Sequence, residues 1–175
     1  LGSYLTEKIP REKVFLKTEG WYAEQKIEWL RGLRATGLDV KNKHIVLPDG
    51  REISYDKLLI TTGCQPRLLD QDVRGVSYLR TLDDADHLFQ LLREQEREAK
   101  ALVYGGGFIA CEYLWTFTHH EIPTTILFRG PWFWSQVLDE KSGQMISTWL
   151  EKKGVRVVPS TSIEELLGEE TLKGV

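Results

Sequence analysis

The chain of 175 residues carries a net charge of −3 at pH 7, and its hydrophobic and charged fractions of 41% and 28% are ordinary for a soluble globular protein. This charge gives no electrostatic reason to expect a nucleic acid or an anionic membrane as partner, and no apolar run approaches the roughly 20 residues that span a bilayer. No signal peptide opens the chain, Cys64 and Cys111 form neither a disulfide framework nor a C-x-x-C pair, and the histidines form no ligand pattern, so we expect a cytoplasmic protein without a bound metal.

The first half of the chain predicts mainly β-structure. Residues 1–20 are weakly patterned and predict no element. Residues 44–63, HIVLPDGREISYDKLLITTG, predict a strand, a Pro-Asp-Gly turn, a second strand and a longer apolar strand at residues 57–63. Because that last run does not alternate, it is typical of a strand buried on both faces. Residues 64–76 form a polar connector, and we expect the crossover between two domains there.

The second half predicts alternating helices and strands. A Thr-x-x-Asp cap at Thr81 begins the first helix, and Asp139 caps the last one. Short strands are predicted at residues 101–104 and 124–128, with a helix between them. The chain returns to strand at residues 155–158, and its last residues read as one more strand. The order of these elements predicts a parallel sheet with helices packed against it.

Each predicted helix has an apolar stripe that we expect to face the core. The residues expected inside recur at helical spacing: Leu82, Ala85, Phe89 and Leu92 in the first helix, Ile109, Tyr113 and Phe117 in the second, and Met145, Ile146, Trp149 and Leu150 in the third.

Gly105-x-Gly107-x-x-Ala110 lies directly between a predicted strand and a predicted helix, where a dinucleotide-binding fingerprint requires it. Gly105 allows a tight turn, Gly107 lets a pyrophosphate approach the backbone amides at the helix N-terminus, and Ala110 keeps the helix close to the strand. The spacing alone also fits a tight turn that binds no ligand. With a second strand following the helix, we expect a Rossmann-like NAD(P)-binding sheet.

The acid that would bind the adenosine ribose about 20 residues after such a fingerprint is missing. The second strand ends in Phe128 and Arg129 instead. Arg129 fits a partner of the 2′-phosphate of NADPH as well as it fits a solvated residue at a strand end. The sequence therefore leaves NADH and NADPH both open.

Several segments together resemble the FAD-dependent pyridine nucleotide-disulfide oxidoreductase superfamily. YDKLLITTGCQPRLL is similar to its Y-D-x-L-hydrophobic-A-T-G-x-x-P-R segment, GVSYLRTLDDADHL to the linker and helix that follow, and ALVYGGGFIACEY to its second, NAD(P)-binding fingerprint. WYAEQKIEWLRG is similar to a run in the branch of ferredoxin reductases, rubredoxin reductases and apoptosis-inducing factor. The chain thus resembles an internal fragment, with a partial FAD-binding domain at residues 1–72 and a truncated NAD(P)-binding domain at residues 73–175.

This resemblance implies two cofactors, FAD and NAD(P)H, with a hydride passed from nicotinamide to flavin and electrons passed on to a small redox protein or small molecule. It is also compatible with a homo-oligomer. The cofactor-binding residues that it implies are Gly105, Gly106, Gly107, Phe108, Ile109, Ala110, Phe128 and Arg129 for NAD(P), and Ala35, Thr62, Gly63 and Arg67 for FAD. Thr62 and Gly63 equally fit a strand end followed by a turn.

The same resemblance implies a catalytic role for Glu112, near the nicotinamide and the flavin. The alternative is an acid in the first helical turn, which the helix dipole favours without any catalysis.

The sequence departs from a complete member of this superfamily, because no FAD fingerprint precedes Gly105 and no C-x4-C dithiol is present. Two other interpretations stay open. One is a non-catalytic NAD(P)-binding or docking module in which Trp132 and Trp134 form a partner surface, although a loop packed over the nucleotide explains these tryptophans more simply. The other is a classical Rossmann dehydrogenase, against which the β-rich segment before the fingerprint argues.

Overall fold

The computed structural model describes residues 1–69, 71, 73–94 and 99–175. The chain forms two compact units: a meander unit of residues 15–65 and a helix–sheet unit of residues 1–14 and 66–175. The predicted boundary after residue 72 separates two cofactor domains, which compactness alone does not test. Residue 72 itself lies outside the described residues, and that boundary stays a prediction.

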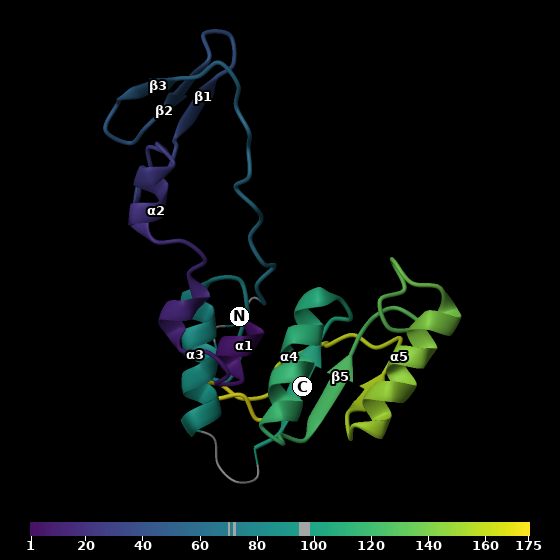
Figure 1. The fold of residues 1–175 in the computed structure, drawn as a ribbon. Coiled ribbons are helices and arrows are strands. Elements are labelled where there is room, and N and C mark those ends of the chain that lie inside the picture. Colours follow the sequence, from purple (N-terminus) through teal and green to yellow (C-terminus); the bar gives the residue numbers. More distant parts are fainter. Residues whose placement is uncertain (70, 72, 95–98) are drawn as a thin grey trace. The chain divides into compact units, whose positions relative to one another are not determined.

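Short antiparallel strands form the sheet of the meander unit (Figure 1). Strand β2 (His44–Val46) pairs with β1 (Gly37–Asp39) on one side and with β3 (Glu52–Ser54) on the other. The predicted Pro-Asp-Gly turn joins β2 to β3, and the Leu47 N–H donates to the carbonyl oxygen of Arg51 across it over 2.9 Å. Both strands predicted around this turn are therefore confirmed.

Residues 57–63 do not form the predicted buried strand, so that prediction is wrong. No described residue pairs with them as a strand neighbour, and the side chains of Leu59 and Ile60 are 83% and 65% exposed. A strand buried on both faces needs neighbouring strands and a packed layer on each side, and the described part of the chain supplies neither for this run. The meander unit also holds α2 (Glu19–Glu24), which the sequence did not predict.

A parallel sheet forms the centre of the helix–sheet unit (Figure 1), with β5 (Thr124–Leu127) between β4 (Ala101–Tyr104) and β6 (Arg156–Val158). Helix α4 (Phe108–His119) joins β4 to β5 and packs against both, and α5 (Glu140–Lys152) joins β5 to β6 and packs against β6. The predicted α/β fold, a parallel sheet with flanking helices after a β-rich segment, is confirmed. None of the described helices is long and apolar enough to cross a membrane.

Three helical segments complete this unit: α1 (Gly2–Leu5), a 3-10 helix (Arg11–Val14) and α3 (Leu82–Glu94). Helix α1 contacts α3 and α4, and its Leu5 side chain is completely buried. The Tyr4 hydroxyl donates to the carboxylate of Asp86 over 2.7 Å, and the Tyr4 ring stacks on Phe89 with 5.2 Å between centroids. The start of the chain therefore contributes to the core, which its weak sequence pattern did not indicate.

The predicted helix caps are confirmed. At the start of α3 the Asp84 N–H donates to Thr81 Oγ1 over 3.1 Å, and the Thr81 N–H donates to Asp84 Oδ2 over 2.6 Å, which closes a reciprocal capping box. At the start of α5 the Ser142 N–H donates to the Asp139 carboxylate over 2.7 Å. Hydrogen bonds from Ser142 hold the pKa of Asp139 below its ordinary value.

The inward face predicted for α4 is partly wrong. Ile109 is 52% exposed, and the helix buries Ala110, Leu114 and Phe117 instead, with Tyr113 half-buried. Most of this helix is apolar, and it contacts α1 as well as the sheet. Because apolar residues surround the helix, their spacing alone could not identify the face toward the sheet.

The face predicted for α5 is also partly wrong, whereas that of α3 is confirmed. Leu150 is buried and Ile146 packs against the core, but Met145 and Trp149 are mostly exposed. The Lys153 ammonium lies 5.8 Å from the Trp149 ring centroid, a contact that an exposed aromatic can make. In α3 the four predicted residues are buried or packed against the core: Leu82, Ala85, Phe89 and Leu92.

The last residues of the chain form no strand, contrary to the prediction, whereas β6 is confirmed. Only isolated bridges, Leu167 with Gly174 and Thr171 with Arg74, pair the described residues there. Gly168 has a φ of 118°, and a Cβ at this glycine would collide with the carbonyl oxygen of Thr171. The tight turn at Gly168 interrupts the extended backbone that a strand requires.

Candidate functional site

The glycine turn joins β4 to α4 at the carboxyl edge of the parallel sheet. Gly105 has a φ of 122°, a conformation that favours glycine, and its N–H donates to the carbonyl oxygen of Leu127 over 2.8 Å. A Cβ at Gly106 would lie 3.3 Å from the Cβ of Phe128, so this position has little room for a side chain. These two glycines therefore have structural reasons to be glycine.

Gly107 has room for a side chain in the structure itself. Its backbone is extended (φ −136°, ψ −161°), and a Cβ there would meet only Trp134 Nε1, at 3.9 Å. Gly107 is the N-cap residue of α4, and no side chain caps the first turn. The N–H groups of that turn and the positive end of the helix dipole therefore remain available to an anionic ligand.

A pocket of about 310 Å³ lies at this turn. Its lining residues follow the ends of β4 and β5: Tyr104, Gly105, Gly106, Gly107, Phe128, Arg129, Gly130, Trp132, Trp134, Ser135 and Gln136. In open α/β sheets, ligands bind outside the carboxyl ends of the strands, which is where this pocket lies.

Contacts with neighbouring residues fix the positions of two tryptophans in the wall of the pocket. The Trp132 indole N–H donates to the carbonyl oxygen of Leu138 over 2.8 Å, and a Cβ at Gly143 in α5 would collide with the Trp132 ring. Trp134 meets the ring of Phe108 edge-on, with 4.2 Å between centroids. Both indoles are half-buried, so they are part of the construction of the pocket.

Arg129 supplies the charge of this pocket. The described lining contains no carboxylate, and no described carboxylate lies within 4.0 Å of the Arg129 guanidinium group. Phe128 points into the core: it is 3% exposed and packs edge-on against Phe133, with 5.9 Å between centroids. The end of β5 therefore presents a cation to a ligand and buries an aromatic ring beside it.

The structure brings five of the predicted NAD(P)-binding residues together in this pocket, namely Gly105, Gly106, Gly107, Phe128 and Arg129. The other three, Phe108, Ile109 and Ala110, follow in the first turn of α4. Ala110 is buried in the core, whereas Phe108 and Ile109 are exposed.

Glu112 does not line the pocket. It is exposed on α4, and its Oε2 lies so close to Gly2 in α1 that a Cβ at that glycine would collide with it. The first turn of α4 contains no acid, so the alternative interpretation of Glu112 as a first-turn acid is wrong. Its catalytic role stays a prediction.

The predicted FAD-binding residues are divided between the two units. Ala35, Thr62 and Gly63 belong to the meander unit, and Arg67 belongs to the helix–sheet unit; all four are exposed. Gly63 has a φ of 72°, which fits a turn. The roles of these four residues in FAD binding stay predictions.

Four residues of the pocket wall were not predicted from the sequence: Tyr104, Gly130, Ser135 and Gln136. Trp132 and Trp134 were predicted only as part of a loop over the nucleotide or of a partner surface. One overlooked signal is Gly143: a glycine inside a helix costs stability, so its presence there indicates that another group packs closely against it. Here the Trp132 ring does so.

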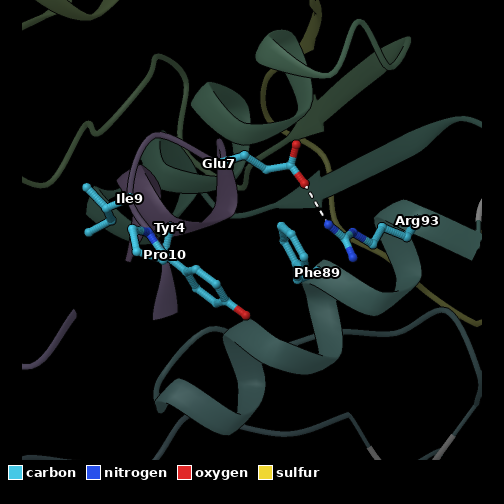
Figure 2. Close-up of a pocket in the computed structure, with 6 residues that line it drawn as sticks. All are labelled: Tyr4, Glu7, Ile9, Pro10, Phe89 and Arg93. Carbon is cyan, nitrogen blue, oxygen red and sulfur yellow. Dashed lines mark hydrogen bonds and ion pairs between the residues drawn. The ribbon is translucent and has the colours of Figure 1, made fainter. Parts of the chain in front are cut away.

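A second pocket of about 290 Å³ lies between the start of the chain and α3 (Figure 2). Glu7 and Arg93 form an ion pair of 3.0 Å across it, and the Arg93 guanidinium also lies 4.5 Å from the Phe89 ring centroid. Since its charged groups pair with each other, they link the start of the chain to α3. Within the described residues, no cluster of His, Cys, Asp and Glu could hold a metal ion.

Comparisons with known proteins identify the family of this chain. The family model for pyridine nucleotide-disulphide oxidoreductases matches residues 3–175. The chain is 36% identical over 178 residues to the ferredoxin–NAD(+) reductase subunit of the benzene 1,2-dioxygenase system of Pseudomonas putida, an alignment that covers 99% of this chain and 41% of that protein.

Two solved structures are similar in fold. Putidaredoxin reductase in its covalent complex with putidaredoxin is 27% identical and has a TM-score of 0.81 over 94% of this chain and 40% of its own. A ferredoxin reductase from Rhodopseudomonas palustris, at 24% identity, has a TM-score of 0.83 over 95% of this chain and 41% of its own. The chain thus spans about two fifths of the length of the relatives that it matches.

Proposed function

Because the chain belongs to the pyridine nucleotide-disulphide oxidoreductase family, we propose that it is the NAD(P)H-binding part of an FAD-dependent NAD(P)H oxidoreductase. In that enzyme a hydride passes from NAD(P)H to FAD, and electrons then pass to an acceptor. Since the chain spans about two fifths of its relatives, this activity is proposed for a longer protein or an assembly that contains these residues.

The room at Gly107 is the observation that carries this proposal. The first turn of α4 is uncapped, and a Cβ at Gly107 would project into space that the described protein atoms leave open. A pyrophosphate that accepts hydrogen bonds from the turn needs this space, because its oxygens must approach the backbone closely. A turn without a ligand would tolerate a side chain at this position.

The residues of the chain bind and orient the coenzyme in this proposal. Gly105 and Gly106 fix the turn, and the N–H groups of Phe108 and Ile109, in the uncapped first turn of α4, would donate to the pyrophosphate. Trp132 and Trp134 form part of the wall of the pocket. When bound, NAD(P)H supplies the hydride; the protein supplies position and electrostatics.

The remaining assignments concern the longer protein. Ala35, Thr62, Gly63 and Arg67 would contribute to FAD binding, and Glu112 would act near the nicotinamide and the flavin. The acceptor would be a small ferredoxin-like redox protein, which is supported by relatives described as a ferredoxin–NAD(+) reductase and as a putidaredoxin reductase in complex with putidaredoxin.

Binding of NADP⁺ and NAD⁺ to the purified chain tests the proposal. Gly107→Ala should weaken the binding of whichever coenzyme binds by about tenfold or more, because the added methyl group occupies the position of the pyrophosphate. Gly107→Glu should abolish binding, because it adds a negative charge. Both variants should keep the circular dichroism of the fold, since Gly107 has an extended backbone and open space around its Cα.

Gly20→Ala is the matched control, because a Cβ at Gly20 in α2 also meets nothing closer than 3.9 Å, and it should not change coenzyme binding. Unchanged binding by both Gly107 variants would refute the proposal. Uptake of FAD by the chain, with a flavin absorbance that NADPH or NADH bleaches, would exclude the alternative of a non-catalytic NAD(P)-binding or docking module.

A further inference from the structure

We propose that this site selects the 2′-phosphorylated coenzyme, NADP(H), and that Arg129 selects it by pairing with the 2′-phosphate of the adenosine ribose. This inference rests on the proposed function, because it concerns the same pocket. It differs from the coenzyme in the description of the relative from Pseudomonas putida, a ferredoxin–NAD(+) reductase.

At the end of the second strand, an NAD(H)-binding fold carries an acid that binds the ribose hydroxyls. In this chain Phe128 occupies that position at the end of β5. Its ring packs against Phe133, and its Cβ lies 3.3 Å from where a Cβ of Gly106 would be. The Phe128 N–H donates to the carbonyl oxygen of Val158, and its own carbonyl oxygen accepts from the Thr161 N–H, at 3.3 and 3.1 Å. The position belongs to the core, so a carboxylate there would be buried without a partner.

The pocket presents a positive charge, that of Arg129. Arg129 is exposed in the pocket wall, and no described carboxylate pairs with it or lines the pocket. A guanidinium group without a protein partner can form bidentate hydrogen bonds with a phosphate, and no negative charge repels that phosphate. A ribose with two free hydroxyls would lose its usual carboxylate acceptor here.

Polar groups also lie next to Arg129 in the pocket wall. Ser135 and Gln136 line the same wall, and a Cβ at Gly130 would collide with Ser135 Oγ. The loop thus folds back so that the Ser135 hydroxyl lies beside the residue that follows Arg129. A hydroxyl and an amide N–H can both donate to phosphate oxygens that the guanidinium group does not reach.

Calorimetric titration of the purified chain with NADP⁺, NAD⁺, 2′,5′-ADP and 5′-AMP measures the four affinities and tests the inference. NADP⁺ should bind at least about tenfold more tightly than NAD⁺, and 2′,5′-ADP should bind more tightly than 5′-AMP by a similar factor. Arg129→Gln should weaken the binding of NADP⁺ and of 2′,5′-ADP by about 10- to 100-fold, and it should change the affinity for NAD⁺ by less than about twofold. Since Arg129 is exposed and unpaired among the described residues, the variant should keep the wild-type circular dichroism.

Arg156→Gln is the matched control: it removes the same charge from an exposed arginine at the start of β6, the strand end opposite the pocket, and should change neither affinity. Equal or tighter binding of NAD⁺, or an Arg129→Gln variant that keeps the NADP⁺ preference, would overturn this inference and leave the proposed function standing. Binding of neither coenzyme would overturn the proposed function, and this inference with it.

Discussion

Replacing Gly143 by alanine should destabilise the protein, although the same change in most helix interiors is stabilising. Alanine exceeds glycine by about 1 kcal/mol in helix propensity. At Gly143, however, a Cβ would collide with Trp132 Cδ1 and lie 2.8 Å from the backbone carbonyl oxygen of Phe133. Because a backbone atom cannot move aside as a flexible side chain can, the added methyl group must displace the loop that carries Trp132.

The expected loss of unfolding free energy in Gly143→Ala is the sum of three contributions. Overpacking of this kind costs about 1–3 kcal/mol, and loss of the hydrogen bond from Trp132 Nε1 to the Leu138 carbonyl oxygen costs about 1 kcal/mol more. After the gain in propensity of about 1 kcal/mol, a net loss of about 2 kcal/mol remains, which lowers Tm by about 4–8 °C in a protein of this size. The displaced Trp132 should also weaken coenzyme binding, since it lines the pocket.

Thermal unfolding followed by circular dichroism measures this effect, with Gly20→Ala in α2 as the control. A Cβ at Gly20 has no neighbour closer than 3.9 Å, so this variant should show an unchanged or higher Tm. A Tm of Gly143→Ala at or above that of the wild type would show that Trp132 does not depend on the missing side chain, and would refute the reasoning.

Two further changes test local features of the fold. Thr81→Ala removes the acceptor of the Asp84 N–H and should cost about 1 kcal/mol, seen as a lower Tm, whereas Thr81→Ser should retain most of the stability; equal Tm values for the two variants would contradict the capping box. Burial raises the pKa of Tyr113 from 10.0 to about 12, against a lowering effect of its hydrogen bond to Ser77. Because the folded-state pKa is raised, the stability from the neutral phenol is present below pH 10 and is lost as the pH rises through about 12. Denaturant unfolding at pH values across this range should therefore show a steeper loss in the wild type than in Tyr113→Phe, and parallel losses would contradict the burial of this hydroxyl.

Local sequence signals predicted the parts of the fold that depend on neighbouring residues. The cap at Thr81, the cap at Asp139 and the Pro-Asp-Gly turn each involve groups within a few residues of one another, and all are present. The glycine turn was also predictable, since a strand, a helix start and a positive φ at Gly105 are encoded within one short segment.

Features that depend on distant contacts were not predictable from the pattern. Ile109 and Ala110 are both apolar, and only the packing of α1 and the sheet on α4 determines which of them is buried. Leu59 and Ile60 resemble a buried strand, but a strand is formed only where neighbouring strands supply hydrogen-bond partners. The pocket wall at Trp132 is formed by contact with a glycine on the following helix, which no local pattern reveals.

The contact between Phe128 and Gly106 explains both why the middle residue of the fingerprint is glycine and why no acid stands at the end of β5. Gly106 has little room for a side chain because Phe128 lies against it, and Phe128 occupies the position from which an acid would bind the ribose. An acid at that position would have to leave the core or be buried beside Phe133, so coenzyme selection cannot be exercised there without loss of packing. The next residue, Arg129, is exposed and free of ion pairs within the described structure, and it can change without cost to the core. Coenzyme preference in this chain should therefore respond to substitution of Arg129, whereas substitution of Phe128 by an acid should first reduce stability.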